Sequence, residues 1–179
     1  MIGLWRAEHW GYRALFLGLA VLVLFIRLLP LGGDPGAFPG PDLLLCLIMA
    51  WVMRRPDFMP VGLVVLVVLV EDLILLRPPG LWTALVVLAT EFIRSRAALT
   101  RELNFVVEWL LVTGLMVAML LAYRLVFALA LLPQPGFGYA VVQVLWSAVA
   151  YPFVVGASRL VLDLRKPATG ETDDYGRRL

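Results

Sequence analysis

Six apolar runs alternate along the chain with short segments rich in proline, glycine and arginine. These runs predict helices at about residues 12–31, 42–53, 58–76, 81–93, 103–132 and 139–164. At ~1.5 Å per residue, the third run would form a helix ~28 Å long, enough to cross the ~30 Å hydrocarbon core of a bilayer. The pattern therefore predicts an all-α, polytopic membrane protein with six transmembrane helices, in a single domain that covers residues 1–164.

Three of the predicted helices have unusual features. The run 42–53 would measure only ~18 Å, so we expect a short span, with a re-entrant hairpin as the alternative. The run 103–132 would measure ~45 Å, so this helix must tilt or project beyond the membrane. In the last run, the pair Tyr151-Pro152 predicts a bend.

The composition agrees with this class, because 62% of the residues are hydrophobic, 16% are charged and the mean hydropathy is +0.92. Cys46 and His9 are single residues of their types, so the usual zinc constellations are excluded and no metal or cofactor is expected. The chain holds three serines and lacks the common catalytic motifs, which predicts a protein that is not an enzyme. Its formal charge of +2 comes from basic residues in short loops, a pattern that does not favour nucleic acid as a partner.

The distribution of basic residues predicts the orientation. Loops on the same side as the N-terminus carry Arg54, Arg55, Arg94, Arg96, Arg101, Arg165, Lys166, Arg177 and Arg178. Loops on the other side carry only Arg77. The positive-inside rule then places both termini in the cytoplasm, and the polar segment 165–179 is predicted to be a disordered cytoplasmic tail.

Charged residues within the apolar runs are the candidate functional residues, because burying a charge in a membrane is costly. Glu71 and Asp72 lie inside the third run, and Arg27 lies at a similar depth in the first. We expect Arg27 to reach Glu71 or Asp72. A proton or ion relay and an anionic-ligand site are both possible readings of this cluster. A buried polar clamp that holds the helices together is favoured, since no chain of further acids or histidines is present.

The remaining intramembrane charges have separate interpretations. Arg77 is five or six residues from the two acids, on the wrong face of a continuous helix, and is expected to snorkel outwards. Glu91 and Arg94 are three residues apart and can pair on one helix face. Glu108 is expected near the inner interface and Arg124 towards the outer one.

Gly114, Ala118 and Ala122 form a ladder of small residues at every fourth position of the fifth run. Such a ladder allows another helix to approach closely. Packing within the chain and docking of a partner protein are both consistent with it.

Several short motifs occur in order along nearly the whole chain. They are D-L-L-L-C-L-I-M-A-W at 42–51, Arg55-Pro56, V-G at 61–62, E-D-L at 71–73, Gly80, Tyr151-Pro152 and the basic pair Arg165-Lys166. Their order and spacing resemble the MreD family of bacterial rod shape-determining membrane proteins. That family has a single Asp-Leu pair followed by a Gly/Ser-type turn. Any role of the family aspartate therefore maps to Asp72 and leaves Glu71 open.

The resemblance implies a non-enzymatic scaffold subunit of the cell-wall elongation complex, needed for rod shape and lateral peptidoglycan synthesis. It implies a multi-pass protein of the bacterial inner membrane, surrounded by membrane lipid. The implied partners are the bitopic protein MreC, the actin-like protein MreB, the elongation-specific penicillin-binding transpeptidase and the wall glycosyltransferase. The helix arrangement of the family is similar to that of the six-helix substrate-binding subunits of vitamin-uptake (ECF-type) transporters.

The last similarity supplies an alternative function, a small-molecule-binding subunit of a membrane transporter. Such a protein needs a polar, aromatic-lined pocket that opens outwards. The predicted outward loops are short and mostly apolar or rich in proline, which disfavours this alternative. An intramembrane lipid enzyme is less favoured still, because the chain lacks an acid–histidine or paired-aspartate motif.

Overall fold

The computed structural model of the chain describes residues 2–29, 39–134 and 136–162, and the predicted tail 165–179 lies outside these ranges. The described part is all-helical and contains no strand. Its elements are α1 (Ile2–Leu28), α2 (Leu43–Arg54), the 3₁₀ turn η1 (Pro56–Phe58), α3 (Val61–Ile74), α4 (Leu81–Ser95), α5 (Ala97–Glu102), α6 (Phe105–Leu129) and α7 (Phe137–Leu162).

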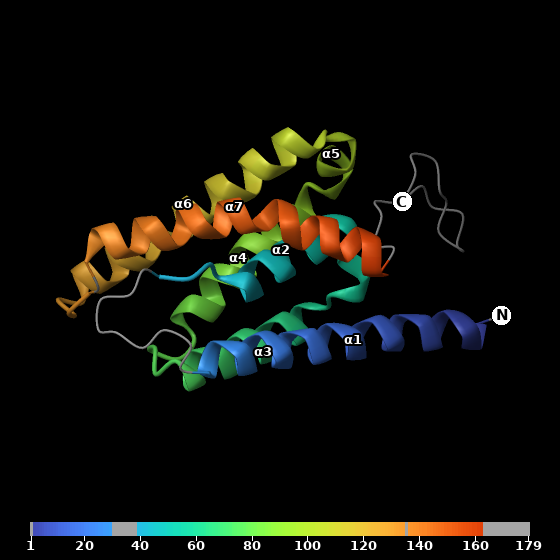
Figure 1. Cartoon of the computed structure of the whole chain (residues 1–179), viewed down its shortest axis with the longest axis horizontal. Coiled ribbons are helices and arrows are strands. Elements are labelled where there is room, and N and C mark those ends of the chain that lie inside the picture. Colours follow the sequence, from blue (N-terminus) through green and yellow to red (C-terminus); the bar gives the residue numbers. More distant parts are fainter. Residues whose placement is uncertain (1, 30–38, 135, 163–179) are drawn as a thin grey trace.

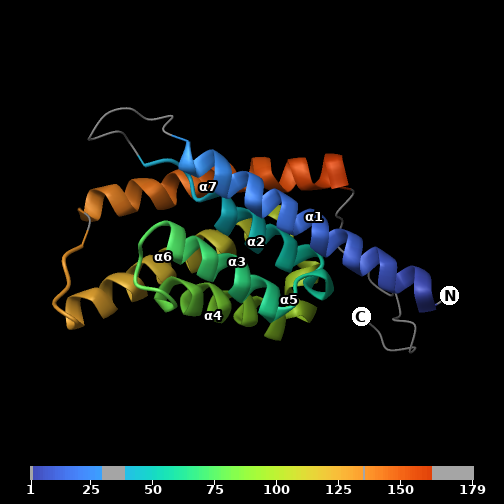
Figure 2. The ribbon, with the colours of Figure 1, turned by 90° about the horizontal axis from the view of Figure 1, so that it is seen from below.

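The helices run alternately in opposite directions along one bundle (Figure 1). α1, α3 and α6 finish at one end, which we call the distal end, and α2, α4 and α7 begin there (Figure 1). We call the opposite end, where α1 begins, the proximal end. α2 occupies the centre of the bundle and packs against α1, α4 and α7 (Figure 2). The other main contacts pair α3 with α4, and α6 with both α4 and α7.

Three helices have the length and apolar composition of transmembrane segments, namely His9–Leu28, Phe105–Leu129 and Phe137–Val161. Their outer faces carry large exposed apolar side chains such as Phe25, Leu125 and Phe153. Many large apolar side chains exposed along long helices suit contact with lipid rather than with water. The three long apolar helices therefore indicate a membrane-embedded protein.

The other three predicted spans are shorter helices. α2, α3 and α4 have 12, 14 and 15 residues, which corresponds to ~18, ~21 and ~23 Å against a hydrocarbon core of ~30 Å. α2 agrees with the predicted range 42–53, but every residue from Leu44 to Arg54 is buried. Its neighbours, rather than lipid, therefore surround it.

The sequence predicted one continuous helix over the run 58–76, but the structure divides this run. Phe58 belongs to η1, and α3 begins only after Pro60, whose extended backbone caps it. At the other end Leu76 adopts a left-handed conformation with φ 52°. The N–H of Leu76 donates to the carbonyl of Leu73, and the N–H of Arg77 donates to that of Asp72. This pair of hydrogen bonds is a Schellman motif, which stops α3 before the prolines that follow.

The boundaries of the long helices also differ from those predicted. α1 begins at Ile2, ten residues before the predicted start at about residue 12. The range 103–132 contains a helix of 25 residues. Its length of ~38 Å is greater than the ~30 Å bilayer core but shorter than the predicted ~45 Å. α6 ends in a second Schellman motif, in which Leu131 has φ 54°. α7 is helical through Pro152.

Candidate functional site

Arg27 connects α1 to α2 and α3 at the distal end. Its Nη1 is hydrogen-bonded to Oε1 of Glu71 and lies 3.7 Å from Oδ1 of Asp42. Glu71 is 1% exposed, whereas the side chain of Arg27 keeps 25% of its surface exposed. The structure thus brings together Arg27 and Glu71, two of the three residues predicted as a clamp.

Asp72 makes a separate set of contacts between α3 and α4. Its Oδ2 accepts hydrogen bonds from the N–H of Gly80, the N–H of Thr83 and the hydroxyl of Thr83, at 3.2, 3.3 and 2.9 Å. The carboxylate therefore caps the start of α4, where the helix dipole also favours a negative charge.

The prediction that Arg77 points outwards, away from the acids, is wrong. Its Nη1 lies 4.0 Å from Oδ1 of Asp72. The prediction assumed a continuous helix, but α3 ends at Ile74, and the reversal at Leu76 turns Arg77 back towards Asp72. The guanidinium of Arg77 also lies over the ring of Trp82, 5.3 Å from its centroid.

A second buried polar network lies nearer the proximal end and was not predicted. Nη2 of Arg54 lies 3.0 Å from Oε1 of Glu108, and the hydroxyl of Tyr151 donates to the same oxygen at 2.8 Å. All three residues are at most 1% exposed. Arg54 also donates to the carbonyl of Ala50 at 3.1 Å. The network therefore joins α2, α6 and α7 inside the bundle.

This network corrects one expectation. Arg54 was expected in a cytoplasmic loop, but it ends α2 and is buried. Glu108 is buried in the first turn of α6, and its expected depth near the inner interface stays a prediction. The length of the run 42–53 could have indicated that Arg54 is buried. Arg54 directly follows this run of twelve residues, which is too short to span a membrane. A basic residue at the end of a buried helix requires a carboxylate partner.

The other predicted charges lie near the helix ends. Nη1 of Arg94 lies 3.1 Å from Oε1 of Glu91, as the three-residue spacing predicted, and Arg94 also donates to the carbonyl of Met59. The guanidinium of Arg124 lies 5.2 Å from the ring centroid of Phe137, at the distal end. Gln134 donates to the carbonyl of Arg124 at 3.0 Å.

The small-residue ladder of α6 faces away from the rest of the chain at two of its three positions. Gly114 and Ala118 are exposed, and Ala122 is half-buried. A Cβ atom built on Gly114 would meet no atom within 4 Å. The described helices therefore do not pack against Gly114.

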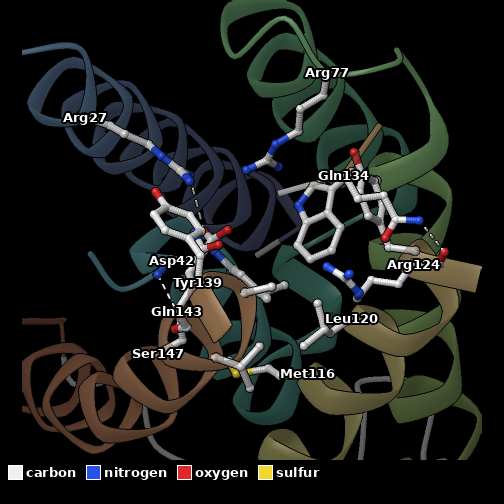
Figure 3. A pocket seen from close by; sticks show the side chains of 15 residues that line it. Arg27, Asp42, Arg77, Met116, Leu120, Arg124, Gln134, Tyr139, Gln143 and Ser147 are labelled. Atoms are coloured by element: carbon white, nitrogen blue, oxygen red, sulfur yellow. Dashed lines mark hydrogen bonds and ion pairs between the residues drawn. The ribbon is translucent and has the colours of Figure 1, made fainter. Parts of the chain in front are cut away.

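A cavity of about 270 Å³ lies at the distal end, among residues from α1, α2, α4, α6, α7 and the connections between them (Figure 3). Three arginines, Arg27, Arg77 and Arg124, contribute to its wall. The remaining lining residues are Asp42, Leu45, Trp82, Met116, Leu120, Tyr123, Gln134, Tyr139, Ala140, Gln143, Val144 and Ser147. The predicted outward loops contribute little of this wall, because most of its residues belong to helices or lie at helix ends.

Local hydrogen bonds hold the α2 side of the cavity in place. Oδ1 of Asp42 accepts from the N–H of Leu45 at 3.1 Å and caps α2. The backbone N–H of Asp42 donates to the hydroxyl of Ser147 at 2.8 Å, which ties α2 to α7. Guanidinium and aromatic groups on such a wall suit a ligand with a negative or delocalised charge. Within the described residues, no group of three or more histidine, cysteine or acidic residues is arranged to hold a metal ion.

Comparisons of the chain with protein-family models, with characterised proteins and with solved structures give no significant match.

Proposed function

We propose that this chain is a non-enzymatic scaffold subunit of a bacterial cell-wall elongation complex, similar to the MreD family, in the inner membrane. The observation that carries the proposal is the outward-facing pair Gly114 and Ala118 on α6. In a membrane, small residues let a second helix approach closely and pack by van der Waals contact. Because a Cβ atom at Gly114 would meet no atom of the described residues within 4 Å, this surface can accept a helix of another protein.

The proposed topology has six membrane-crossing helices and both termini in the cytoplasm. Its support is the alternation of helix direction and the placement of basic residues. α2 and α4 end at the proximal end with Arg54-Arg55 and with Arg94-Arg96 respectively. Arg54 is buried, so within the described residues Arg55, Arg94, Arg96 and Arg101 carry the positive-inside signal.

The resemblance identifies MreC, MreB, the elongation-specific transpeptidase and the wall glycosyltransferase as the proposed partners. We expect Gly114→Leu and Ala118→Leu to reduce recovery of MreC or the transpeptidase with the affinity-purified chain, because a larger side chain separates the helices. The abundance of the chain itself should not change. Val117→Leu, at a neighbouring exposed position, is the matched control.

Depletion of the chain in a rod-shaped host should make cells widen and round up while septal division continues. Unchanged cell shape, together with unchanged partner recovery by the Gly114 and Ala118 variants, would exclude the scaffold function. A fall in abundance of these variants alone would show that the surface acts in folding instead.

The distal cavity favours a second candidate function, a small-molecule-binding subunit of a membrane transporter. It has the polar and aromatic wall that such a subunit requires, with Trp82, Tyr123 and Tyr139 beside the three arginines. This candidate predicts saturable binding of a soluble compound by the purified protein.

A further inference from the structure

The wall of the distal cavity carries more positive than negative groups. Three guanidinium groups and one carboxylate, that of Asp42, line it. Glu71 and Asp72, which interact with Arg27 and Arg77, lie behind the wall and do not line it. Arg27 and Arg77 keep 25% and 21% of their side-chain surfaces exposed, so their donors are not fully enclosed by protein. Figure 3 shows Arg27, Arg77 and Arg124 converging from different elements.

An apolar groove of about 250 Å³ lies between α1, α2 and α7. Leu19 and Val23 line it on α1, and Val154, Ala157 and Val161 line it on α7. Ser158 is its one polar lining residue. Its apolar wall and the absence of charged lining residues suit this groove to a lipid tail rather than to water.

The cavity and the groove lie on the same faces of two helices. Val23 in the groove and Arg27 in the cavity are four residues apart on α1, so they share one face. Ser147 in the cavity and Val154 in the groove are seven residues apart on α7, which again places them on one face. Along α1 and α7, the lining of the groove therefore lies on the proximal side of the lining of the cavity.

We propose that the distal cavity and this groove together bind one anionic phospholipid, with its phosphate among the three arginines and an acyl chain in the groove. Guanidinium groups bind phosphate through paired, charge-assisted hydrogen bonds. The apolar groove distinguishes a lipid from a soluble anion, because it offers burial to an acyl chain and, among its lining residues, only Ser158 as a polar partner for a small solute. This site does not depend on the scaffold function, since binding is measured on the purified chain alone.

The test is native mass spectrometry of the delipidated, monodisperse protein titrated with phosphatidylglycerol and with phosphatidylcholine of the same acyl chains. Phosphatidylglycerol should bind at one saturable site and more tightly than phosphatidylcholine. Arg77→Gln and Arg124→Gln should each weaken its binding about tenfold or more, the usual effect of losing a hydrogen bond to a charged group. Arg96→Gln, an exposed arginine at the proximal end, is the control and should have no effect.

Further variants distinguish the contribution of the acyl chain to binding from that of the headgroup, and they control for misfolding. Ala157→Trp, at an exposed position in the groove, should weaken phosphatidylglycerol binding while leaving the protein monodisperse. Arg77→Lys and Arg124→Lys keep the charge and should weaken binding less than the glutamine variants. Equal affinity for the two lipids, or unaltered binding by the Arg77 and Arg124 variants, would refute the proposal. Glycerol 3-phosphate binding at the same site as tightly as the lipid would overturn it in favour of a soluble ligand.

Discussion

At the scale of single residues, the interior of this protein is organised by charges that are paired between helices. A buried ion pair adds little net stability, because desolvation offsets the Coulomb attraction. Removing one partner is costly, since the other charge is then buried alone. Arg27 with Glu71 and Arg54 with Glu108 follow this logic, and each pair joins helices that are distant in sequence. We interpret both pairs as groups that specify which helices pack together.

The Arg27–Glu71 pair supplies the first prediction. Arg27→Ala should lower the free energy of unfolding by ~3–5 kcal/mol, because Glu71 is left buried without its partner. Thermal denaturation in mild detergent measures the change. The double variant Arg27→Glu with Glu71→Arg should recover part of the stability, and Arg159→Ala, at an exposed position, should have little effect. Wild-type stability of Arg27→Ala would rule out the clamp.

At the scale of elements, prolines and left-handed leucines set the helix lengths. α3 and α6 both end in Schellman motifs whose left-handed residue is a leucine, Leu76 and Leu131, rather than the usual glycine. Both leucines are 92% exposed. They are at the distal end, where their side chains can contact lipid instead of protein. The apolar pattern continues past both helix ends, so it predicted helices that were too long.

Leu76→Gly should therefore stabilise the protein. Glycine adopts positive φ without steric strain, whereas leucine costs ~1–2 kcal/mol in this conformation. After the greater loss of backbone entropy by glycine, we expect a gain of about 0.5–1 kcal/mol in the free energy of unfolding. Leu75→Gly is the control, since Leu75 has φ −86° and the same substitution there should destabilise. Denaturation of both variants under identical conditions decides between these outcomes.

At the scale of the whole molecule, long and short helices form one bundle. The three long helices present apolar surface to lipid, while the short helix α2 is enclosed by its neighbours. Enclosure explains how polar groups such as Arg54 are accommodated at membrane depth, because their partners come from surrounding helices. The distal end gathers the cavity and its arginines, and the proximal end carries the basic helix termini.

The six-span topology makes a prediction for the whole chain. In a Cys46→Ala background, single cysteines at Pro79 and Pro133, both exposed at the distal end, should react with a membrane-impermeant thiol reagent in intact cells. A cysteine at Ser95, exposed at the proximal end, should react only after the membrane is permeabilised. Labelling of Ser95→Cys in intact cells would contradict a cytoplasmic N-terminus.

The sequence alone determined the class of the protein and the existence of its main helices. Apolar runs of this length predict helices in a membrane-embedded protein whatever their neighbours, because an unpaired backbone in lipid is unfavourable and a helix satisfies it locally. The pairing of Arg27 with an acid of the third run was also within reach. A charged side chain inside a membrane protein is costly without a partner of opposite charge, and the predicted depths of Arg27 and of the acids in the third run are similar.

Only the tertiary structure decided which distant residues meet. Arg54, Glu108 and Tyr151 are spread over almost a hundred positions, and no local period connects them. Their contact depends on α2, α6 and α7 packing side by side. The same holds for the cavity, whose three arginines come from separate segments of the chain. It holds also for Gly114, whose ladder has the same spacing whether it faces the chain or a partner. Helical periodicity defines faces, but the face that is buried is set by the packing of the whole bundle.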